Sequence, residues 1–183
     1  MPENRRVKMT KRMLKEALID LMNEKTLEKV TVTEICKAAD VNRSTFYAYY
    51  EDISALMTEI ENEVLEHITV YAENFDDYSD KKILEVFEEF FNYVKENAKV
   101  FRVLFLRYDN RNFHHRMLDN IMEKYKISIE CNGELPAKYT YVYSVSGVIG
   151  LMGEWIDSGF SISSKKLAKM VWQMCVKATR DAK

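Results

Sequence analysis

Residues 40–50, with the sequence DVNRSTFYAYY, combine a polar turn, a run of hydroxyl groups and four aromatic rings. On a helix that begins at Arg43, the rings of Phe46 and Tyr50 point to one side and Ser44 points to the opposite side. Such a helix buries its rings on one face and exposes small polar groups and one guanidinium on the other. Groups of these kinds hydrogen-bond to base edges and phosphates in the major groove of DNA. This face is therefore a candidate nucleic-acid contact.

Two short helices and a turn must position this face. The sequence TVTE at residues 31–34 predicts a capping box, in which the first threonine and the glutamate each satisfy a backbone N–H of the other. The helix that follows ends at Asp40, a residue that tolerates the left-handed backbone of a tight turn. Asn42 is placed to cap the next helix. With an amphipathic helix over about residues 10–24 in front of them, these elements form a helix-turn-helix pattern.

The charge distribution sets the first 50 residues apart from the rest of the chain. They carry ten Lys or Arg against seven Asp or Glu, whereas the remaining residues carry 17 against 22. The first 15 residues alone hold six basic groups against Glu3. A basic head on an acidic body indicates a polyanionic partner at the head. A basic tail that only meets solvent remains the alternative.

The stretch VTVTEICKAADVNRSTFYAYYEDISALM, residues 30–57, resembles the DNA-binding signature of the TetR family of transcriptional regulators. The similarity extends over roughly residues 8–58. It matches a T-x-x-x-I helix, a turn that has Asp40 in place of the usual glycine, and a T-F-Y-x-Y-Y helix. The resemblance implies that bases are read by Arg43, Ser44 and Thr45, and that phosphates are contacted by Thr33, Tyr47 and Tyr49.

The composition of the whole chain favours helices. Two prolines and five glycines interrupt 183 residues that are 47% hydrophobic. Apolar spacing predicts helices that agree with the family's all-α fold of about nine helices, over residues 53–73, 83–97, 100–106, 112–130, 135–157 and 163–180. We expect a helix-turn-helix DNA-binding domain over residues 1–52 and a helical regulatory and dimerisation domain over residues 53–183.

The resemblance also implies that the C-terminal body senses a partner. Its aromatic and methionine side chains would suit a small apolar effector, and a protein coactivator is the other partner that the family suggests. The effector-binding candidates are Phe87, Phe91, Phe105, Tyr108 and Met117. The same residues recur at helical spacing, so a purely structural core is the alternative.

The last two helices carry features that suggest an interface. Three glycines follow one another at three-residue spacing within residues 147–153, although glycine costs a helix about 1 kcal/mol relative to alanine. Close approach of another helix would offset this cost, and the family forms homodimers through its last two long helices. The candidate interface residues are Gly147, Gly150, Trp155, Trp172 and Val176. Tight packing within one subunit is the alternative.

No residue pattern points to catalysis, to a cofactor or to a metal. The three histidines lack the spacing of metal ligands, the three cysteines form no CxxC pair, and no nucleophile–base order stands out. The sequence has no signal peptide and no apolar run long enough for a membrane span, so we expect a cytoplasmic protein.

The sequence therefore predicts a homodimeric transcriptional regulator, by family habit a repressor, that binds double-stranded DNA at a near-palindromic operator. The alternative is a ligand- or protein-binding adaptor of the same fold that no longer reads DNA. Ile53, which stands where many family members have a lysine, and the acidic pair Glu51–Asp52 favour that alternative.

Overall fold

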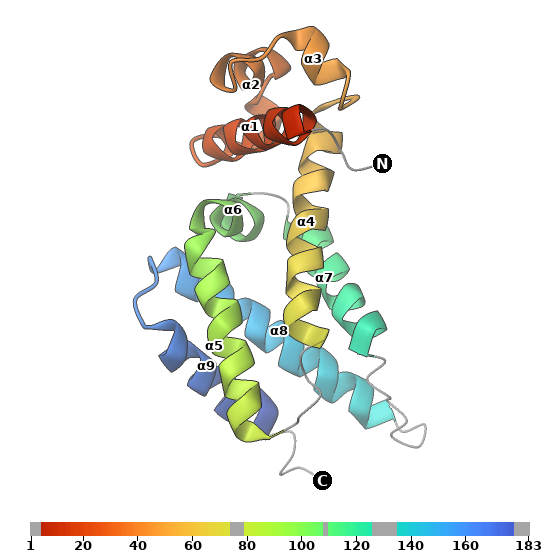
Figure 1. Ribbon diagram of the computed structural model, residues 1–183. Helices are drawn as coiled ribbons and strands as arrows, with labels where there is room; N and C mark the ends of the chain where they lie inside the picture. The colour runs from red at the N-terminus through yellow and green to blue at the C-terminus, as the bar shows by residue number, and fades with distance from the viewer. Residues whose placement is uncertain (1–4, 74–78, 108–109, 126–134, 178–183) are drawn as a thin grey trace.

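The computed structural model describes residues 5–73, 79–107, 110–125 and 135–177, and within these ranges the chain is helical and has no strand (Figure 1). Its N-terminal part contains three α-helices and a short 3₁₀ turn. These are α1 (Arg5–Met22), η1 (Leu27–Lys29), α2 (Val32–Ala38) and α3 (Arg43–Tyr47). We call α1 to α3 the head.

The remaining elements form the body. They are α4 (Ile53–Glu73), α5 (Asp80–Glu96), α6 (Ala98–Arg102), the π-helical turn η2 (Val103–Arg107), α7 (Asn110–Tyr125), α8 (Leu135–Asp157), α9 (Ser164–Val171) and the π-helical turn η3 (Trp172–Lys177). Within the described ranges, no helix is long and apolar enough to cross a membrane.

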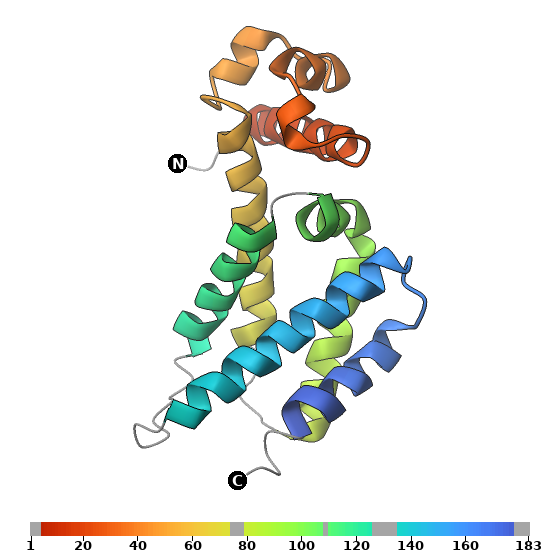
Figure 2. The same ribbon diagram turned by 180° about the vertical axis from the view of Figure 1, so that it is seen from behind.

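The head lies at one end of the molecule, and α4 leads from it into the body (Figures 1 and 2). Within the body, α7 packs along α4, α5 packs against α9, and α8 crosses between these pairs. Buried apolar side chains of the head and the body belong to one hydrophobic core. The position of the head therefore depends on how the body packs around α4.

Most helices lie where apolar spacing predicts them, and α1 and the segment over residues 100–106 differ for physical reasons. α1 begins at Arg5 rather than near residue 10, because its first turns carry few buried residues and therefore no apolar period. The expected single helix over residues 100–106 is instead α6 followed by η2. The wider π-helical turn accommodates three consecutive buried residues, Val103, Leu104 and Phe105.

The final helix predicted over residues 163–180 is divided in the structure, and residues 178–180 lie outside the described ranges. α9 ends at Val171 and continues as the π-helical turn η3 to Lys177. Ser163 caps α9, and its hydroxyl accepts a hydrogen bond from the backbone N–H of Lys166 at 3.2 Å. The start of this helix thus follows from a local signal, whereas its widened end does not.

Ion pairs join the head to α4. Nζ of Lys11 lies 3.2 Å from Oε2 of Glu59, Nζ of Lys15 lies 3.4 Å from Oε1 of Glu59, and Lys15 also pairs with Glu63. Burial alone would raise the pKa of Glu59, but the hydrogen bond from Lys11 and the charges of both lysines outweigh it and lower that pKa. Lys11 also lies 5.5 Å from the ring centroid of Tyr50.

Two further polar contacts tie elements of the body to the head and to α4. On α6, Nζ of Lys99 lies 2.6 Å from Oδ1 of Asp20 on α1. On α7, Arg116 pairs with Glu61 of α4, whose side chain is 7% exposed, and donates a second hydrogen bond to Asn62. The head therefore contacts α6 directly and reaches α7 through α4.

Candidate nucleic-acid interface

The capping box predicted at the start of α2 is present. The backbone N–H of Glu34 donates to Oγ1 of Thr31 at 3.3 Å, and the backbone N–H of Thr31 donates to Oε2 of Glu34 at 3.0 Å. Lys25 holds the same carboxylate, with 2.6 Å between Nζ and Oε1. The hydrogen bonds from Lys25 and Thr31 together lower the pKa of Glu34 from 4.5 to about 2. This cluster fixes the first turn of α2, which carries Thr33.

The turn between α2 and α3 is a Schellman motif. The backbone N–H of Val41 donates to the carbonyl of Cys36 at 2.9 Å, and that of Asp40 donates to the carbonyl of Lys37 at 3.4 Å. Asp40 has a φ of +53°, as expected of the residue in the left-handed position. The turn therefore sets the direction of α3 through the backbone, with aspartate in the place that glycine fills in many such turns.

The cap of α3 is only partly as predicted. Asn42 precedes the helix with an extended backbone, and its carbonyl accepts hydrogen bonds from the N–H groups of Thr45 and Phe46. Its side chain, however, makes no capping hydrogen bond. The predicted side-chain cap is therefore wrong, and the extended backbone of Asn42 starts the helix.

The inner face of α3 anchors it to the head. Phe46 is fully buried and Tyr50 is 4% exposed, and their ring centroids are 5.8 Å apart. The ring of Tyr47 meets the edge of Phe46 at 5.5 Å but remains 51% exposed. The four aromatic rings of residues 46–50 thus divide as predicted, with Phe46 and Tyr50 in the core, Tyr47 on the surface and Tyr49 between them in exposure.

The outer face of the head carries most of the side chains that were predicted to contact DNA. Arg43, Ser44 and Tyr47 of α3 are exposed, and so is Thr33 of α2. Thr45 is half-buried, and Tyr49 is half-buried against the hydrophobic core. The structure brings the four exposed side chains to the outside of the helix-turn-helix and gives the other two less freedom to reach a partner.

The basic N-terminal residues have two different environments. Lys11 and Lys15 lie between α1 and α4, where they bind the carboxylates described above, whereas Arg5, Lys8 and Arg12 are exposed. The sequence holds a signal for this pairing, because both lysines and both of their glutamate partners are four residues apart and so form facing stripes. Lys37, exposed on α2 near Asp40, is a cation that the sequence analysis did not single out.

The effector candidates in the body have different environments. Phe91 and Met117 are 0% and 2% exposed and belong to the core, and Phe87 stacks on Phe91 with 6.1 Å between ring centroids. Tyr108 lies outside the described residues. Of the candidates within the described ranges, Phe105 lines a cavity. The alternative of a structural core therefore fits Phe91 and Met117.

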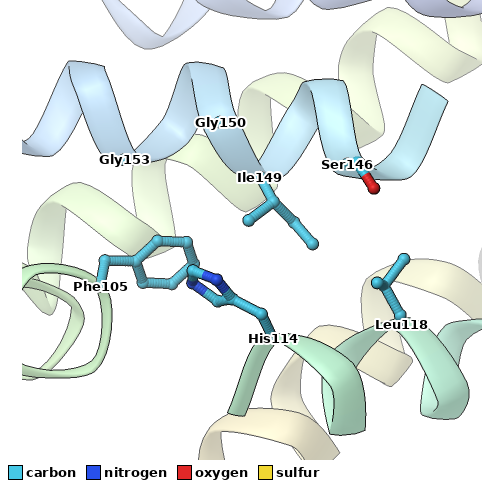
Figure 3. Close-up of a pocket in the computed structure, with 7 residues that line it drawn as sticks. All are labelled: Phe105, His114, Leu118, Ser146, Ile149, Gly150 and Gly153. Carbon is cyan, nitrogen blue, oxygen red and sulfur yellow. The ribbon is translucent and has the colours of Figure 1, made fainter. Parts of the chain in front are cut away.

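A cavity of about 400 Å³ lies between η2, α7 and α8 (Figure 3). Its lining combines apolar side chains with one imidazole, one hydroxyl and two glycines. The lining residues are Phe105, His114, Leu118, Ser146, Ile149, Gly150 and Gly153. Of these residues, the sequence predicted only Phe105 as a ligand contact. The others come from three elements that are distant in sequence, so no local pattern connects them.

The candidates for the dimer interface also differ in burial. Trp155 is 3% exposed, meets the edges of Phe91 and Phe160, and donates from Nε1 to the carbonyl of Ile162 at 2.8 Å. Trp155 thus packs within the subunit, and its assignment to a dimer interface stays a prediction. Trp172 is half-buried and donates to Oδ1 of Asp80 at 3.3 Å.

Of the other interface candidates, the two glycines are not buried, and the side chain of Val176 is not described. Gly147 is half-buried and Gly150 is exposed, and a Cβ added to Gly150 would meet no atom within 4 Å. The side chain of Val176 lies outside the described residues. Close packing within the subunit therefore does not account for Gly150.

Two family models match the chain over most of its length. A model described as bacterial regulatory proteins, tetR family, matches residues 14–60. A model described as transcriptional regulator C-terminal region matches residues 81–177. The first match covers the helix-turn-helix, and the second covers more than half of the chain.

Curated relatives and a solved structure agree with these matches. The uncharacterized HTH-type transcriptional regulator YxbF of Bacillus subtilis is 22% identical over 88% of this chain, which spans only 43% of that protein's length. The HTH-type dhaKLM operon transcriptional activator DhaS of Lactococcus lactis is 25% identical, with 84% of this chain and 82% of that protein covered. The crystal structure of a TetR transcriptional regulator from Streptococcus agalactiae superposes with a TM-score of 0.69 at 21% identity, covering 93% of this chain and 96% of the other.

Proposed function

The chain belongs to the TetR family of DNA-binding transcriptional regulators, and we propose that it binds a near-palindromic operator as a homodimer and represses the adjacent genes. In this proposal, residues 1–52 read the operator, and residues 53–183 dimerise and sense an effector. The observation that carries the proposal is the outer face of α3, where Arg43, Ser44 and Tyr47 are exposed behind a rigid turn.

The chemistry of this face supports roles for each residue in the DNA contact. Arg43, in the first turn of α3, has the reach and the paired donors to read a guanine edge. Ser44 and Thr45 offer hydroxyls to neighbouring base edges, while Thr33, Tyr47 and Tyr49 would bind phosphates that hold the helix in register. The half-buried positions of Thr45 and Tyr49 make them the weaker contributors in this set.

Exposed apolar side chains in the last elements support the homodimer. Val142 and Tyr143 of α8 and Met174 of η3 are 37%, 73% and 55% exposed. Exposed apolar surface of this kind is typical of an interface. Tyr143→Glu would place a charge there and should convert the dimer to a monomer in sedimentation experiments, whereas Lys95→Glu on the exposed side of α5 should leave the dimer intact.

A dimer of this kind would set the spacing of the two heads. Successive major grooves on one side of the duplex are about 34–36 Å apart, so the operator should contain two half-sites at that separation. The cavity of Figure 3 has one wall on η2, directly after α6, and another on α7. Because Lys99 of α6 contacts the head and Arg116 of α7 contacts α4, an occupied cavity would bias the position of the heads.

The assignment as a repressor rests on the resemblance to the TetR family, whereas the relative DhaS carries the name of an activator. A reporter gene placed behind the selected operator distinguishes the two directions. Repression predicts that reporter output falls when the protein is produced and recovers when an effector is added. A rise in output on production of the protein would replace the repressor assignment with an activator.

Selection of bound duplexes from a random DNA pool tests the function. The wild-type protein should enrich an inverted repeat, and the Arg43→Ala/Tyr47→Ala variant should not, because it loses a base reader and a phosphate contact. Lys165→Ala, which removes one exposed charge from α9 in the body, is the matched control and should enrich the same repeat. A pool that stays random with folded wild-type protein would favour the adaptor that no longer reads DNA.

A further inference from the structure

The two glycines that line the cavity leave open space rather than closing a contact. An added Cβ at Gly150 would meet no atom within 4 Å, and one at Gly153 would lie 3.9 Å from Cδ1 of Phe105, an ordinary contact distance. Each glycine destabilises the middle of a helix relative to alanine. Packing therefore does not require glycine at either position, and the effect of both is to leave the cavity unfilled.

His114 places a polar atom without a partner beside this cavity. Its Nε2 is buried and has no hydrogen-bond partner, although the residue as a whole is half-buried. The imidazole packs against Phe105, with 4.9 Å between ring centroids, and it is tilted by 53°. A buried polar atom without a partner is unfavourable, and native structures rarely leave one.

The surroundings of His114 favour its uncharged form. Burial and then the neighbouring His115 lower the pKa of His114. The other described residues that line the cavity are Phe105, Leu118, Ser146, Ile149 and the two glycines, and none of these carries a charge. On α4, which packs against α7, Glu61 is paired with Arg116. The cavity therefore offers apolar walls, one neutral imidazole and one hydroxyl.

We propose that this cavity binds a neutral, mainly apolar molecule whose hydroxyl group hydrogen-bonds to Nε2 of His114. A hydroxyl both donates and accepts, so it satisfies Nε2 in either tautomer of the neutral ring. A carboxylate or an ammonium group would enter without an opposite charge in the lining, at a large desolvation cost. The exposed residues Ser146 and Gly150 mark the entrance along α8.

This inference rests on the proposed effector function, for which it names the chemical class of the ligand. It concerns binding to the free protein, so it can be tested without DNA. A cavity that binds the ligand without changing operator affinity would leave this inference intact and remove the effector from the proposed function. A protein that binds its operator but binds no small-molecule probe would overturn this inference and leave the proposed operator binding intact.

Three probes of similar shape separate the contributions: 2-naphthol, naphthalene and 2-naphthoate. Their binding to the full chain can be followed through their own fluorescence. We expect 2-naphthol to bind about tenfold more tightly than naphthalene, which corresponds to one hydrogen bond. We expect 2-naphthoate to bind at least about tenfold more weakly than 2-naphthol, because its charge is not compensated.

Two variants and a control locate the site. His114→Phe keeps an aromatic ring but removes Nε2, so 2-naphthol and naphthalene should then bind equally. Gly153→Leu should fill the cavity next to Phe105 and abolish the binding of both probes. His115→Phe changes the exposed neighbour on the same helix and should preserve the preference for 2-naphthol.

The proposal is overturned if 2-naphthoate binds as tightly as 2-naphthol, or if none of the probes binds the folded wild-type protein. It is equally overturned if Gly153→Leu, with a circular dichroism spectrum and melting curve like those of the wild type, still binds 2-naphthol. If His114→Phe unfolds, His114→Gln keeps a polar side chain of smaller size and should weaken 2-naphthol more than naphthalene.

Discussion

Cζ of the Arg43 guanidinium lies 6.0 Å from the ring centroid of Tyr47, one helical turn further along α3. Both side chains are exposed, so this cation–π contact contributes only about 0.5–1 kcal/mol. Its importance lies in orientation, because the ring limits the directions in which the guanidinium can point. The phosphate contact proposed for Tyr47 and the base contact proposed for Arg43 are therefore coupled.

Substitutions of Tyr47 should separate these two effects. Tyr47→Phe keeps the ring but loses the hydroxyl, and should weaken binding by about 1 kcal/mol on all duplexes alike. Tyr47→Ala also frees Arg43, and should additionally reduce the preference for the operator over a shuffled duplex. Fluorescence anisotropy with both duplexes measures the two effects, and an unchanged preference in Tyr47→Ala would show that the two contacts are independent.

The turn between α2 and α3 predicts different effects on stability for two substitutions of Asp40. Glycine adopts the φ of +53° without strain, so Asp40→Gly should leave the free energy of unfolding within about 1 kcal/mol of wild type. Asp40→Val introduces a β-branched side chain into the left-handed region and should lower it by about 1–2 kcal/mol. Urea unfolding gives both values. Equal stability of the two variants would contradict the role of the turn.

The capping box of α2 predicts a dependence of stability on pH. The folded pKa of Glu34, about 2, lies below its ordinary value of 4.5. The contribution of this carboxylate is therefore complete above pH 4.5 and is lost as the pH falls toward 2. At neutral pH the wild type should have a higher melting temperature than Glu34→Gln. This difference should disappear as the pH falls from 4.5 toward 2.

A second substitution in the same cluster is a check on this interpretation. Lys25→Met removes the ammonium that contributes most to the shift, while the hydrogen bonds with Thr31 remain. The gap between Lys25→Met and Lys25→Met/Glu34→Gln should therefore be smaller than in the wild-type background. A gap between wild type and Glu34→Gln that stays constant from pH 6 to pH 2.5 would argue against the cluster as its source.

The pair of Glu61 and Arg116 predicts a pH effect of the opposite sign. Burial raises the pKa of Glu61, and the charge of Arg116 partly offsets this. Arg116→Met leaves a buried carboxylate unpaired and should lower the free energy of unfolding by about 2 kcal/mol at neutral pH, less than for a fully buried pair because Arg116 is 39% exposed. Because Glu61 then takes up a proton, the loss should shrink as the pH falls through its raised pKa.

The double variant Glu61→Leu/Arg116→Leu is the control for that pair. It replaces both charges by apolar groups, so it should recover most of the stability that Arg116→Met loses. Chemical unfolding at pH 7 and pH 5 compares the three proteins. A double variant less stable than Arg116→Met would mean that the pair itself stabilises the contact of α4 with α7.

The sequence predicts the head in detail because its signals are local. The hydrogen bonds of Thr31 with Glu34, the left-handed Asp40 and the division of Phe46 from Tyr47 each depend on residues within a few positions of one another. The helix ranges of the body follow in the same way from apolar spacing, as α4 and α8 illustrate.

The features that the sequence missed depend on how distant elements meet. Trp155 looks equally suited to an interface and to a core until the positions of α5 and the α8–α9 connection are known. Lys11 belongs to a basic segment by charge but faces Glu59 because of the angle between α1 and α4. His114 becomes a candidate ligand contact only because η2, α7 and α8 leave a cavity beside it.

We propose above all that the outer face of α3 reads a DNA sequence. The most direct measurement is the ratio of affinities for the selected operator and a shuffled duplex, at one fixed salt concentration, for wild type and Arg43→Ala. We expect a wild-type ratio of at least about 10³, and a loss of about 1–3 kcal/mol per half-site in Arg43→Ala that falls mainly on the operator. A wild-type ratio near one, or an equal loss on both duplexes in Arg43→Ala, would contradict this proposal.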